Sequence, residues 1–154
     1  NIPMNKKILT YKNIILNINL ILDTTSPITN IEKMSIIANE LYSEFNYWTF
    51  CGFYIVSNGI LVIGPYNGNI IPCTHISIGN GVCGISAKEK KTIIVDDVSK
   101  FQHYISCDSN TKSEIVIPIY DKEELIAVLD IDSPNLRDFN KIDKEYLERI
   151  SILI

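Results

Sequence analysis

The chain has 154 residues, of which 46% are hydrophobic and 21% are charged. This length suits one ordinary domain and is too short for two, and the composition is that of a folded globular protein. The 14 Lys and Arg residues are outnumbered by 18 Asp and Glu residues, for a net charge of -4. Without a dense basic run, this balance argues against a nucleic-acid-binding protein. We therefore expect a single domain over residues 1–154.

The apolar stretch Ile14–Leu22 is the segment that most resembles a membrane or signal sequence. It is interrupted by Asn17 and Asn19, and it falls well short of the ~20 apolar residues that span a bilayer. Lysines precede it, but Asp23 follows it and no small-residue cleavage site is present. We expect no membrane contact and a cytoplasmic protein, in which the cysteines are kept as thiols.

The N-terminal third predicts two helices. Apolar residues recur at intervals of about three and four over Lys6–Leu22 and again over Ile31–Phe45, which is the pattern of amphipathic helices. Pro27 separates them because it disfavours helical angles in the residue before it. The oxygens of Thr29 and Asn30 are suited to cap the second helix.

The middle of the chain predicts an antiparallel meander and a third helix. Runs rich in β-branched and aromatic residues predict strands, and they lie at Thr49–Val56, Ile60–Ile63, Asn69–Ile71 and His75–Ile78. Asn58-Gly59 is a strong hairpin signal because both residues accept positive φ, and Pro65–Gly68 predicts a second turn. A helix is expected over Val82–Lys90.

The C-terminal part predicts a strand, an irregular segment, a hairpin and a last helix. The strands are expected at Thr92–Val95, Ser113–Tyr120 and Leu125–Asp132, and the helix at Ile142–Ile154. Between the first two strands, Asp96–Asp108 is irregular, with a short helical turn after Asp97. This order of elements predicts an α+β domain in which helices pack against one antiparallel sheet.

Four cysteines stand far apart, at positions 51, 73, 83 and 107. Their spacing matches neither a zinc ribbon nor the Cys-x-x-Cys redox motif. A mixed site with His75 and His103 would also lack paired ligand spacing. We therefore expect no metal ion.

The four cysteines differ in their settings. Cys51 lies inside a strand and is most simply a small buried hydrophobic residue. Cys73 follows a proline and Cys107 lies in a polar loop, so both should be reachable. Cys83 falls at the start of a predicted helix, where the helix N-terminus would lower the pKa of its thiol. From their positions alone, these three cysteines are equally well interpreted as packing residues or as chemically active residues.

Three carboxylates add a second signal. Glu114 stands at the head of an apolar strand, and Asp130 and Asp132 end the strand that pairs with it. The period of two in a strand sends Asp130 and Asp132 to the same face. Carboxylates in such apolar settings are costly unless they bind a group such as an ammonium or hold a proton. The alternative is that they cap a turn before Pro134.

These cysteines and carboxylates, in this order, resemble the free methionine-(R)-sulfoxide reductases, a family of GAF domains. The motifs that carry the resemblance are Gly52-Phe53-Tyr54, Leu61–Pro65, Cys73-Thr74, Gly81-Val82-Cys83-Gly84, Asp97-Val98, Cys107-Asp108-Ser109, Ser113-Glu114-Ile115-Val116 and Leu129–Pro134. The resemblance implies a six-stranded antiparallel sheet flanked by helices, with an enclosed pocket for a free amino acid.

The resemblance also implies roles for individual residues. Cys107 would be the nucleophile that attacks the sulfoxide sulfur, and Glu114 would hydrogen-bond or protonate the sulfoxide oxygen. The resulting sulfenic acid would be resolved as a disulfide by Cys73 or by Cys83. Thioredoxin would then reduce that disulfide as the electron donor, with no cofactor bound to the protein. The oligomeric state stays open, a homodimer included.

Further residues are implied in substrate binding. Asp130 and Asp132 match the acidic pair that holds the polar groups of the substrate. Backbone N–H groups around Gly81 and Val82 are expected to receive its carboxylate. Tyr54 would form a wall of the methyl pocket, although a core tyrosine is an equal alternative.

The sequence departs from the family pattern at a few positions and leaves other functions open. Phe50 stands where the family usually has tryptophan, Asn80 stands where it tends to have a basic residue, and the loop before Cys107 differs. One alternative is a GAF sensor that binds a nucleotide or metabolite without reacting. Another is a thiol redox switch, which would leave the carboxylates without a role.

Overall fold

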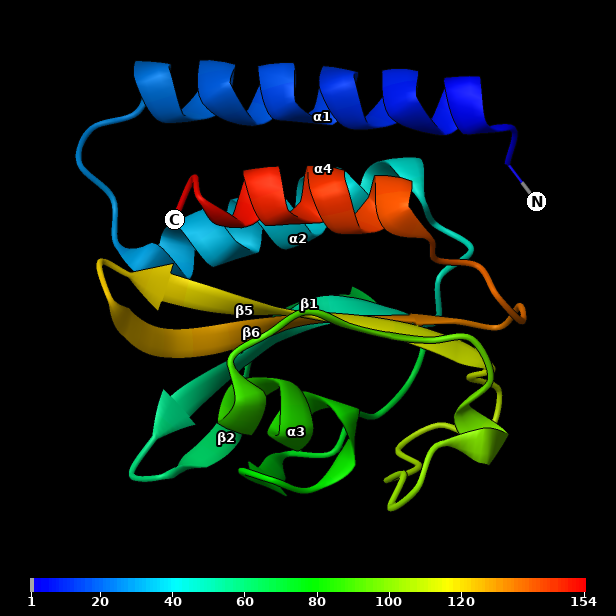
Figure 1. Ribbon diagram of the computed structural model, residues 1–154. Coiled ribbons are helices and arrows are strands. Elements are labelled where there is room, and N and C mark those ends of the chain that lie inside the picture. Colours follow the sequence, from blue (N-terminus) through cyan, green and yellow to red (C-terminus); the bar gives the residue numbers. More distant parts are fainter. Residues whose placement is uncertain (1) are drawn as a thin grey trace.

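The computed structural model describes residues 2–154 and stacks helices and sheet in layers (Figure 1). Helix α1 (Met4–Thr24) forms the outermost layer, and α2 (Asn30–Glu44) and α4 (Lys141–Ser151) lie between it and the sheet. Helix α3 (Gly81–Glu89) covers the opposite face. The sheet is thus buried on both sides, as the prediction of helices packed against one sheet requires.

One antiparallel sheet of six strands forms the centre, in the order β3-β2-β1-β6-β5-β4. Its strands are β1 (Phe50–Ser57), β2 (Ile60–Gly68), β3 (His75–Ser77), β4 (Ile93–Val95), β5 (Ser113–Asp121) and β6 (Glu124–Ser133). The predicted hairpin at Asn58-Gly59 is present, and both residues have positive φ, 52° and 80°. The α+β class and the six-stranded antiparallel sheet are therefore confirmed.

Alternation along the three central strands divides the core in two. Odd-numbered residues such as Phe53, Ile117 and Leu129 pack with α1, α2 and α4 in one apolar cluster. Even-numbered residues such as Tyr54, Val116 and Val128 pack with α3 in a second cluster. Because successive side chains of a strand point to opposite faces, the parity of a residue decides which cluster it joins. Cys51 belongs to the first cluster and is fully buried, as predicted.

The predicted turn at Pro65–Gly68 and the strand at Asn69–Ile71 are wrong. Strand β2 instead continues to Gly68, and its last residues pair with the start of β1. The register shifts between Gly52 and Tyr54, so that a β-bulge takes up Pro65, a residue that cannot donate to a regular ladder. A side chain on Gly52 would collide with Tyr66 opposite it, so this glycine permits the close approach of the two strands.

The remaining predicted elements agree with the structure to within a few residues. Thr29 caps α2 by accepting a hydrogen bond from the backbone N–H of Glu32. The short helical turn predicted after Asp97 is a 3₁₀ helix at Val98–Lys100. Among residues 2–154, none of the helices has the length and apolar character needed to cross a bilayer.

A buried ion pair joins the outer helix to the rest of the fold. The Lys7 Nζ lies 2.9 Å from an Asp143 carboxylate oxygen, and the two side chains are 7% and 0% exposed. Asp143 also accepts hydrogen bonds from the Tyr11 hydroxyl at 2.6 Å and the backbone N–H of Asn140 at 2.8 Å. The carboxylate therefore links α1 to the capping box of α4.

We predict that Lys7→Met destabilises the protein by about 3–5 kcal/mol, because it leaves the Asp143 charge buried without its cation. The measurement is chemical denaturation followed by circular dichroism. Lys12→Met is the matched control, since Lys12 lies on the exposed side of the same helix. Equal stabilities of the two variants would contradict a structural role for this ion pair.

Candidate active site

The register of β5 and β6 brings the three predicted carboxylates together. Glu114 lies directly opposite Asp132, and Val116 lies opposite Asp130. Cross-strand partners project to the same face of a sheet, so Glu114, Asp130 and Asp132 all point to the side covered by α3. We call these three residues the acid cluster. The prediction that Asp130 and Asp132 share a face is confirmed.

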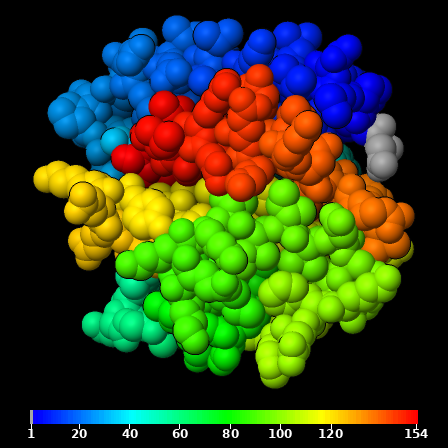
Figure 2. Space-filling model, in the orientation of Figure 1, coloured from blue at the N-terminus to red at the C-terminus, as the bar shows by residue number. Residues whose placement is uncertain are grey.

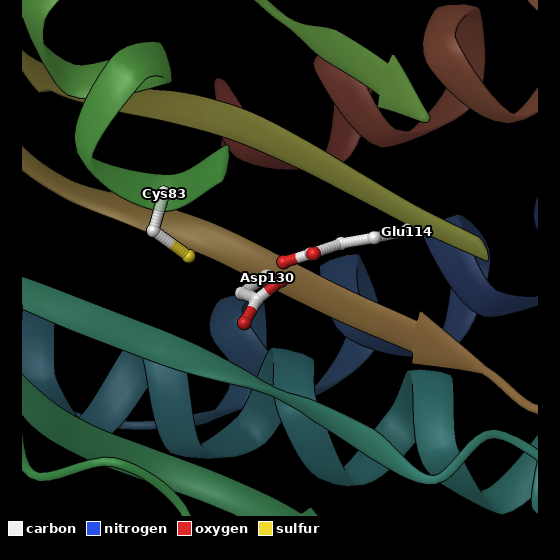
Figure 3. Close-up of side chains that lie close together, drawn as sticks. All are labelled: Cys83, Glu114 and Asp130. Atoms are coloured by element: carbon white, nitrogen blue, oxygen red, sulfur yellow. The ribbon is translucent and has the colours of Figure 1, made fainter. Parts of the chain in front are cut away.

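Helix α3 closes over the acid cluster and supplies Cys83, whose side chain points down toward the carboxylates of Asp130 and Glu114 (Figure 3). The start of the helix is held tightly: Gly81 has φ of 64°, and a side chain on Gly84 would collide with the Ser77 carbonyl. The glycines around Cys83 therefore let the helix N-terminus approach the sheet.

A pocket opens between this helix, the sheet and two loops. Its cavity volume is about 20 Å³, which is room for about one water molecule, and the space beyond it opens to solvent. The predicted site residues in its wall are Tyr54, Gly81, Val82, Cys83, Cys107, Glu114, Asp130 and Asp132. One side of the pocket is therefore acidic and the remainder is largely apolar.

A disulfide joins Cys73 to Cys107 at the mouth of this pocket, with a Cα–Cα distance of 5.4 Å. Cys107 lies in the pocket wall, whereas Cys73 is held beside it by a hydrogen bond of 2.9 Å from the Tyr54 hydroxyl to its carbonyl oxygen. Both cysteines are half-buried. Residues that are distant in sequence thus place a disulfide at the pocket that also holds the acid cluster.

The acid cluster is strongly desolvated. Glu114, Asp130 and Asp132 are 5%, 5% and 8% exposed, and one carboxylate oxygen of each aspartate is buried without a hydrogen-bond partner. Burial, followed by the charges of the two aspartates, raises the pKa of Glu114 well above its ordinary value. Burial also raises the pKa of Asp130 and that of Asp132. Without a cation, the cluster is therefore driven to hold protons.

The expectation that the helix N-terminus lowers the pKa of the Cys83 thiol is wrong. Cys83 is 4% exposed, and burial followed by the negative charges of Asp130 and Glu114 raises its pKa well above the ordinary value. Desolvation and the nearby carboxylates outweigh the helix dipole, whose effect at a helix terminus is about 0.3–2 kcal/mol. Cys83 is therefore a neutral thiol in this site.

The aspartates do not cap the turn before Pro134, which was the alternative reading of Asp130 and Asp132. Their side chains line the pocket, while the turn is closed by the Ser133 hydroxyl, which accepts a hydrogen bond of 3.1 Å from the backbone N–H of Asn135. The carboxylates are thus free to meet a ligand.

The same residues offer donors for a metal ion. The Cys83 sulfur and one carboxylate oxygen each from Glu114 and Asp130 lie within 4.8 Å of one another. A thiolate and two carboxylates would suit a divalent cation such as Zn²⁺. The sequence did not predict this site, because its three residues come from three separate elements and show no metal-ligand spacing.

The structure adds wall residues that the sequence did not reveal. They are Ile70, Pro72, Ile76, Tyr104 and Ile105, from the loops and the short strand around the pocket. Phe50, noted only as a departure from the family pattern, is 1% exposed and stacks on Tyr54 with ring centroids 6.0 Å apart. The sequence offered one signal for this placement: Phe50 and Tyr54 both have even numbers in β1, so their side chains point to the same face of the sheet.

Comparison with known proteins agrees with this geometry. A model of the GAF domain matches residues 32–154. The chain is 42% identical to "GAF domain-containing protein A" of Dictyostelium discoideum, over 80% of this chain and 78% of that protein. It is 34% identical to the free methionine-R-sulfoxide reductase of Escherichia coli, over 82% of this chain and 74% of the relative.

A solved structure extends the likeness to three dimensions. The free methionine-R-sulfoxide reductase of Neisseria meningitidis, in complex with its substrate, superimposes with a TM-score of 0.89 at 31% identity, covering 96% of this chain and 87% of that one. The chain belongs to the GAF-domain family of free methionine-R-sulfoxide reductases. In this GAF domain the pocket wall, the acid cluster and the disulfide stand together on one face of the sheet.

We predict that this GAF domain loses stability as the pH rises above about 4. The carboxyl groups of the acid cluster have pKa values raised above their ordinary values of 3.8 and 4.5. Their contribution is complete below those ordinary values and is lost as the pH rises through the folded ones. Urea denaturation at a series of pH values measures this fall. The Asp130→Asn/Asp132→Asn variant should show a flatter profile, and parallel profiles would contradict the assignment.

Proposed function

We propose that the protein reduces free L-methionine-(R)-sulfoxide to methionine with the thiols of Cys107 and Cys73. The observation that carries this proposal is the Cys73–Cys107 disulfide at the mouth of a pocket lined by three buried carboxyl groups. A disulfide in that position is the product expected after one round of sulfoxide reduction. The names of the relatives supply the substrate and its stereochemistry.

In the first step, the sulfur of Cys107 attacks the sulfoxide sulfur, and oxygen is transferred to Cys107. The sulfoxide is reduced to methionine, and Cys107 becomes a sulfenic acid. The sulfoxide oxygen must receive a proton as its bond to sulfur breaks. Glu114 suits this role, since burial and the neighbouring aspartates raise the pKa of its carboxyl group well above the ordinary value.

In the second step, the thiol of Cys73 attacks the sulfenic acid, a disulfide forms, and water leaves. The geometry favours Cys73 over Cys83 as the resolving residue. Cys73 is already bonded to Cys107, while Cys83 is a free and buried thiol. A dithiol donor such as thioredoxin would then reduce the disulfide by exchange, which the partial exposure of both sulfurs permits.

The acid cluster explains why a free amino acid is the substrate. Its unpartnered aspartate oxygens would receive the ammonium group of methionine sulfoxide, and the proton load of the cluster would fall as that cation arrives. The substrate carboxylate would meet the N-terminus of α3, where the side chain of Asn80 makes no capping hydrogen bond. A peptide-bound residue carries amides in place of both charges and would leave the acids unpaired.

The apolar wall would take the methyl and methylene groups of the substrate. Phe50 and Tyr54 form part of it, and the Tyr54 hydroxyl also fixes the Cys73 backbone. Phenylalanine at position 50 keeps an aromatic face in the place where the family usually has tryptophan. Binding of the methyl group should therefore survive this departure.

We further infer that residues 1–154 act as one GAF domain. Although the family model begins at residue 32, α1 shares the apolar cluster of α2 and α4 through Tyr11, Ile14 and Ile18, each 0% exposed. Its removal would uncover that core.

A non-catalytic sensor has no need of the Cys73–Cys107 pair beside the acids, which favours the enzyme.

We predict that Cys107→Ser abolishes the reduction of free methionine-(R)-sulfoxide. Cys73→Ser should still convert one equivalent of substrate and then stall, because the sulfenic acid cannot be resolved. The measurement is NADPH oxidation with thioredoxin and thioredoxin reductase, with methionine counted in a single turnover. Cys51→Ser is the matched control, since Cys51 faces the other side of the sheet.

Three results would contradict this scheme. Turnover by Cys107→Ser would show that Cys107 is not the nucleophile. Full recycling by Cys73→Ser would show that Cys83 resolves the sulfenic acid. Equal consumption of the R and S sulfoxides by the parent protein would contradict the proposed preference for the R form.

We predict that Glu114→Gln lowers kcat by about 10²–10⁴-fold, the usual range for loss of a general acid. Glutamine keeps the size of the side chain but cannot give up a proton. The rate at which the reduced Cys107 reacts with an uncharged alkylating reagent should stay nearly unchanged. A parallel loss in both measurements would show that the substitution disturbs access to the site instead.

A further inference from the structure

The pocket holds a buried thiol that the proposed reaction does not use. In that scheme Cys107 and Cys73 carry the redox steps, and Cys83 is left without a role. Its sulfur and one carboxylate oxygen each from Glu114 and Asp130 lie within 4.8 Å of one another. The three side chains converge from α3, β5 and β6 (Figure 3).

These donor atoms are withdrawn from bulk water. Cys83, Glu114 and Asp130 are 4%, 5% and 5% exposed, and the segment around α3, coloured green, covers this side of the sheet in the space-filling view (Figure 2). Acidic groups on a surface are solvated by water, whereas buried ones gain much more from a cation.

The remaining acid of the cluster is a second, separate indication of a cation. Asp132 lines the same pocket and is 8% exposed. Among residues 2–154, one of its carboxylate oxygens is buried with no hydrogen-bond partner, as is one oxygen of Asp130. Because buried polar groups are almost always paired, these oxygens point to a positively charged ligand.

The dimensions suit a single ion. Zinc lies about 2.3 Å from a sulfur ligand and about 2.0–2.2 Å from a carboxylate oxygen, so two ligands of one ion are at most about 4.5 Å apart. The three donor atoms are close to this limit, and small side-chain rotations would bring them within it. The cavity volume of about 20 Å³ is room for about one water molecule, which would serve as the fourth ligand.

The donor set selects the kind of cation. Thiolate ligands favour Zn²⁺ and similar soft ions, whereas Ca²⁺ and Mg²⁺ prefer oxygen ligands. On binding, the ion forms one bond to each donor atom, and the protons held by the thiol and the carboxyl groups leave to solvent. The step needs no oxidant or reductant.

We propose that Cys83, Glu114 and Asp130 form a binding site for a thiophilic divalent cation such as Zn²⁺, and that this cation excludes the ammonium group of the substrate. The binding stands on the geometry alone. The exclusion rests on the proposed function, in which Asp130 receives that ammonium. The expectation of no metal ion rested on sequence spacing, whereas these ligands are brought together only by the fold.

The test uses Cd²⁺, whose bond to a thiolate gives a charge-transfer band in the ultraviolet, and the chain with its Cys73–Cys107 disulfide intact. In that form the free thiols are Cys51 and Cys83, and Cys51 faces the other side of the sheet. The parent protein should show the band on titration. Cys83→Ser should lose it, and the matched control Cys51→Ser should keep it. A parent protein without the band at millimolar Cd²⁺ overturns the proposal, and so does a band that Cys83→Ser retains.

The carboxyl ligands are tested by calorimetric titration of Zn²⁺ into the same disulfide form. Asp130→Asn and Glu114→Gln should each raise Kd by at least about tenfold, since loss of a group that only supports a ligand already costs about 10–100-fold. Both variants keep the thiol, so this comparison holds even if Cys83→Ser does not fold. Ca²⁺ should bind the parent protein at least about tenfold more weakly than Zn²⁺. Unchanged Kd values in both variants, or equal affinity for the two ions, would overturn the ligand set.

The exclusion is measured as reductase activity, with the reducing system checked separately for its own response to Zn²⁺. The ion should raise KM for free methionine-(R)-sulfoxide and leave kcat unchanged. Each variant is compared with its own activity without Zn²⁺: Cys51→Ser should respond as the parent does, and Cys83→Ser should be at least about tenfold less sensitive. Equal sensitivity of Cys83→Ser would contradict the exclusion, because the ion would then act at another site. A chain that binds Zn²⁺ as described but reduces no sulfoxide would refute the proposed function, and the exclusion with it, while supporting the metal site.

Discussion

The burial of three carboxyl groups on one face of the sheet is the constraint on which the site depends. Glu114, Asp130 and Asp132 lie where a β protein would ordinarily place valine or isoleucine, and their unpartnered oxygens carry a desolvation cost. Two states relieve that cost: the cluster holds protons, or a cation enters the pocket. Under the proposed function the two aspartates would receive the ammonium group, and Glu114 would keep the proton that sulfoxide reduction needs.

The helix that covers the acid cluster serves the same chemistry. Its N-terminus offers unpaired backbone N–H groups to an anion, while Cys83 beneath them stays neutral because burial raises the pKa of its thiol. In the proposed function, a zwitterionic amino acid would meet the acid cluster at one end and the positive helix N-terminus at the other. The sulfur of Cys107 stands at the mouth, where the methyl sulfoxide end of such a ligand would lie.

Much of this arrangement could be predicted from the sequence because it follows local rules. Alternation placed Asp130 and Asp132 on one face, and the Asn58-Gly59 signal fixed the first hairpin. The end of β2 could not be foreseen, since a bulge that accommodates Pro65 depends on pairing with a strand elsewhere in the chain. The pKa of Cys83 was mispredicted for the same reason: it is raised by burial of the thiol and then by the carboxylates of β5 and β6, and both depend on distant parts of the chain.

The central claim is that the acid cluster recognises the ammonium group of a free amino acid. The most direct measurement compares kcat/KM for free methionine-(R)-sulfoxide with that for its N-acetyl derivative, which keeps the sulfoxide but lacks the cation. The account predicts a loss of about 10³-fold or more for the acetylated compound, because buried carboxylates would be left unpaired. Equal values of kcat/KM for the two compounds would contradict it.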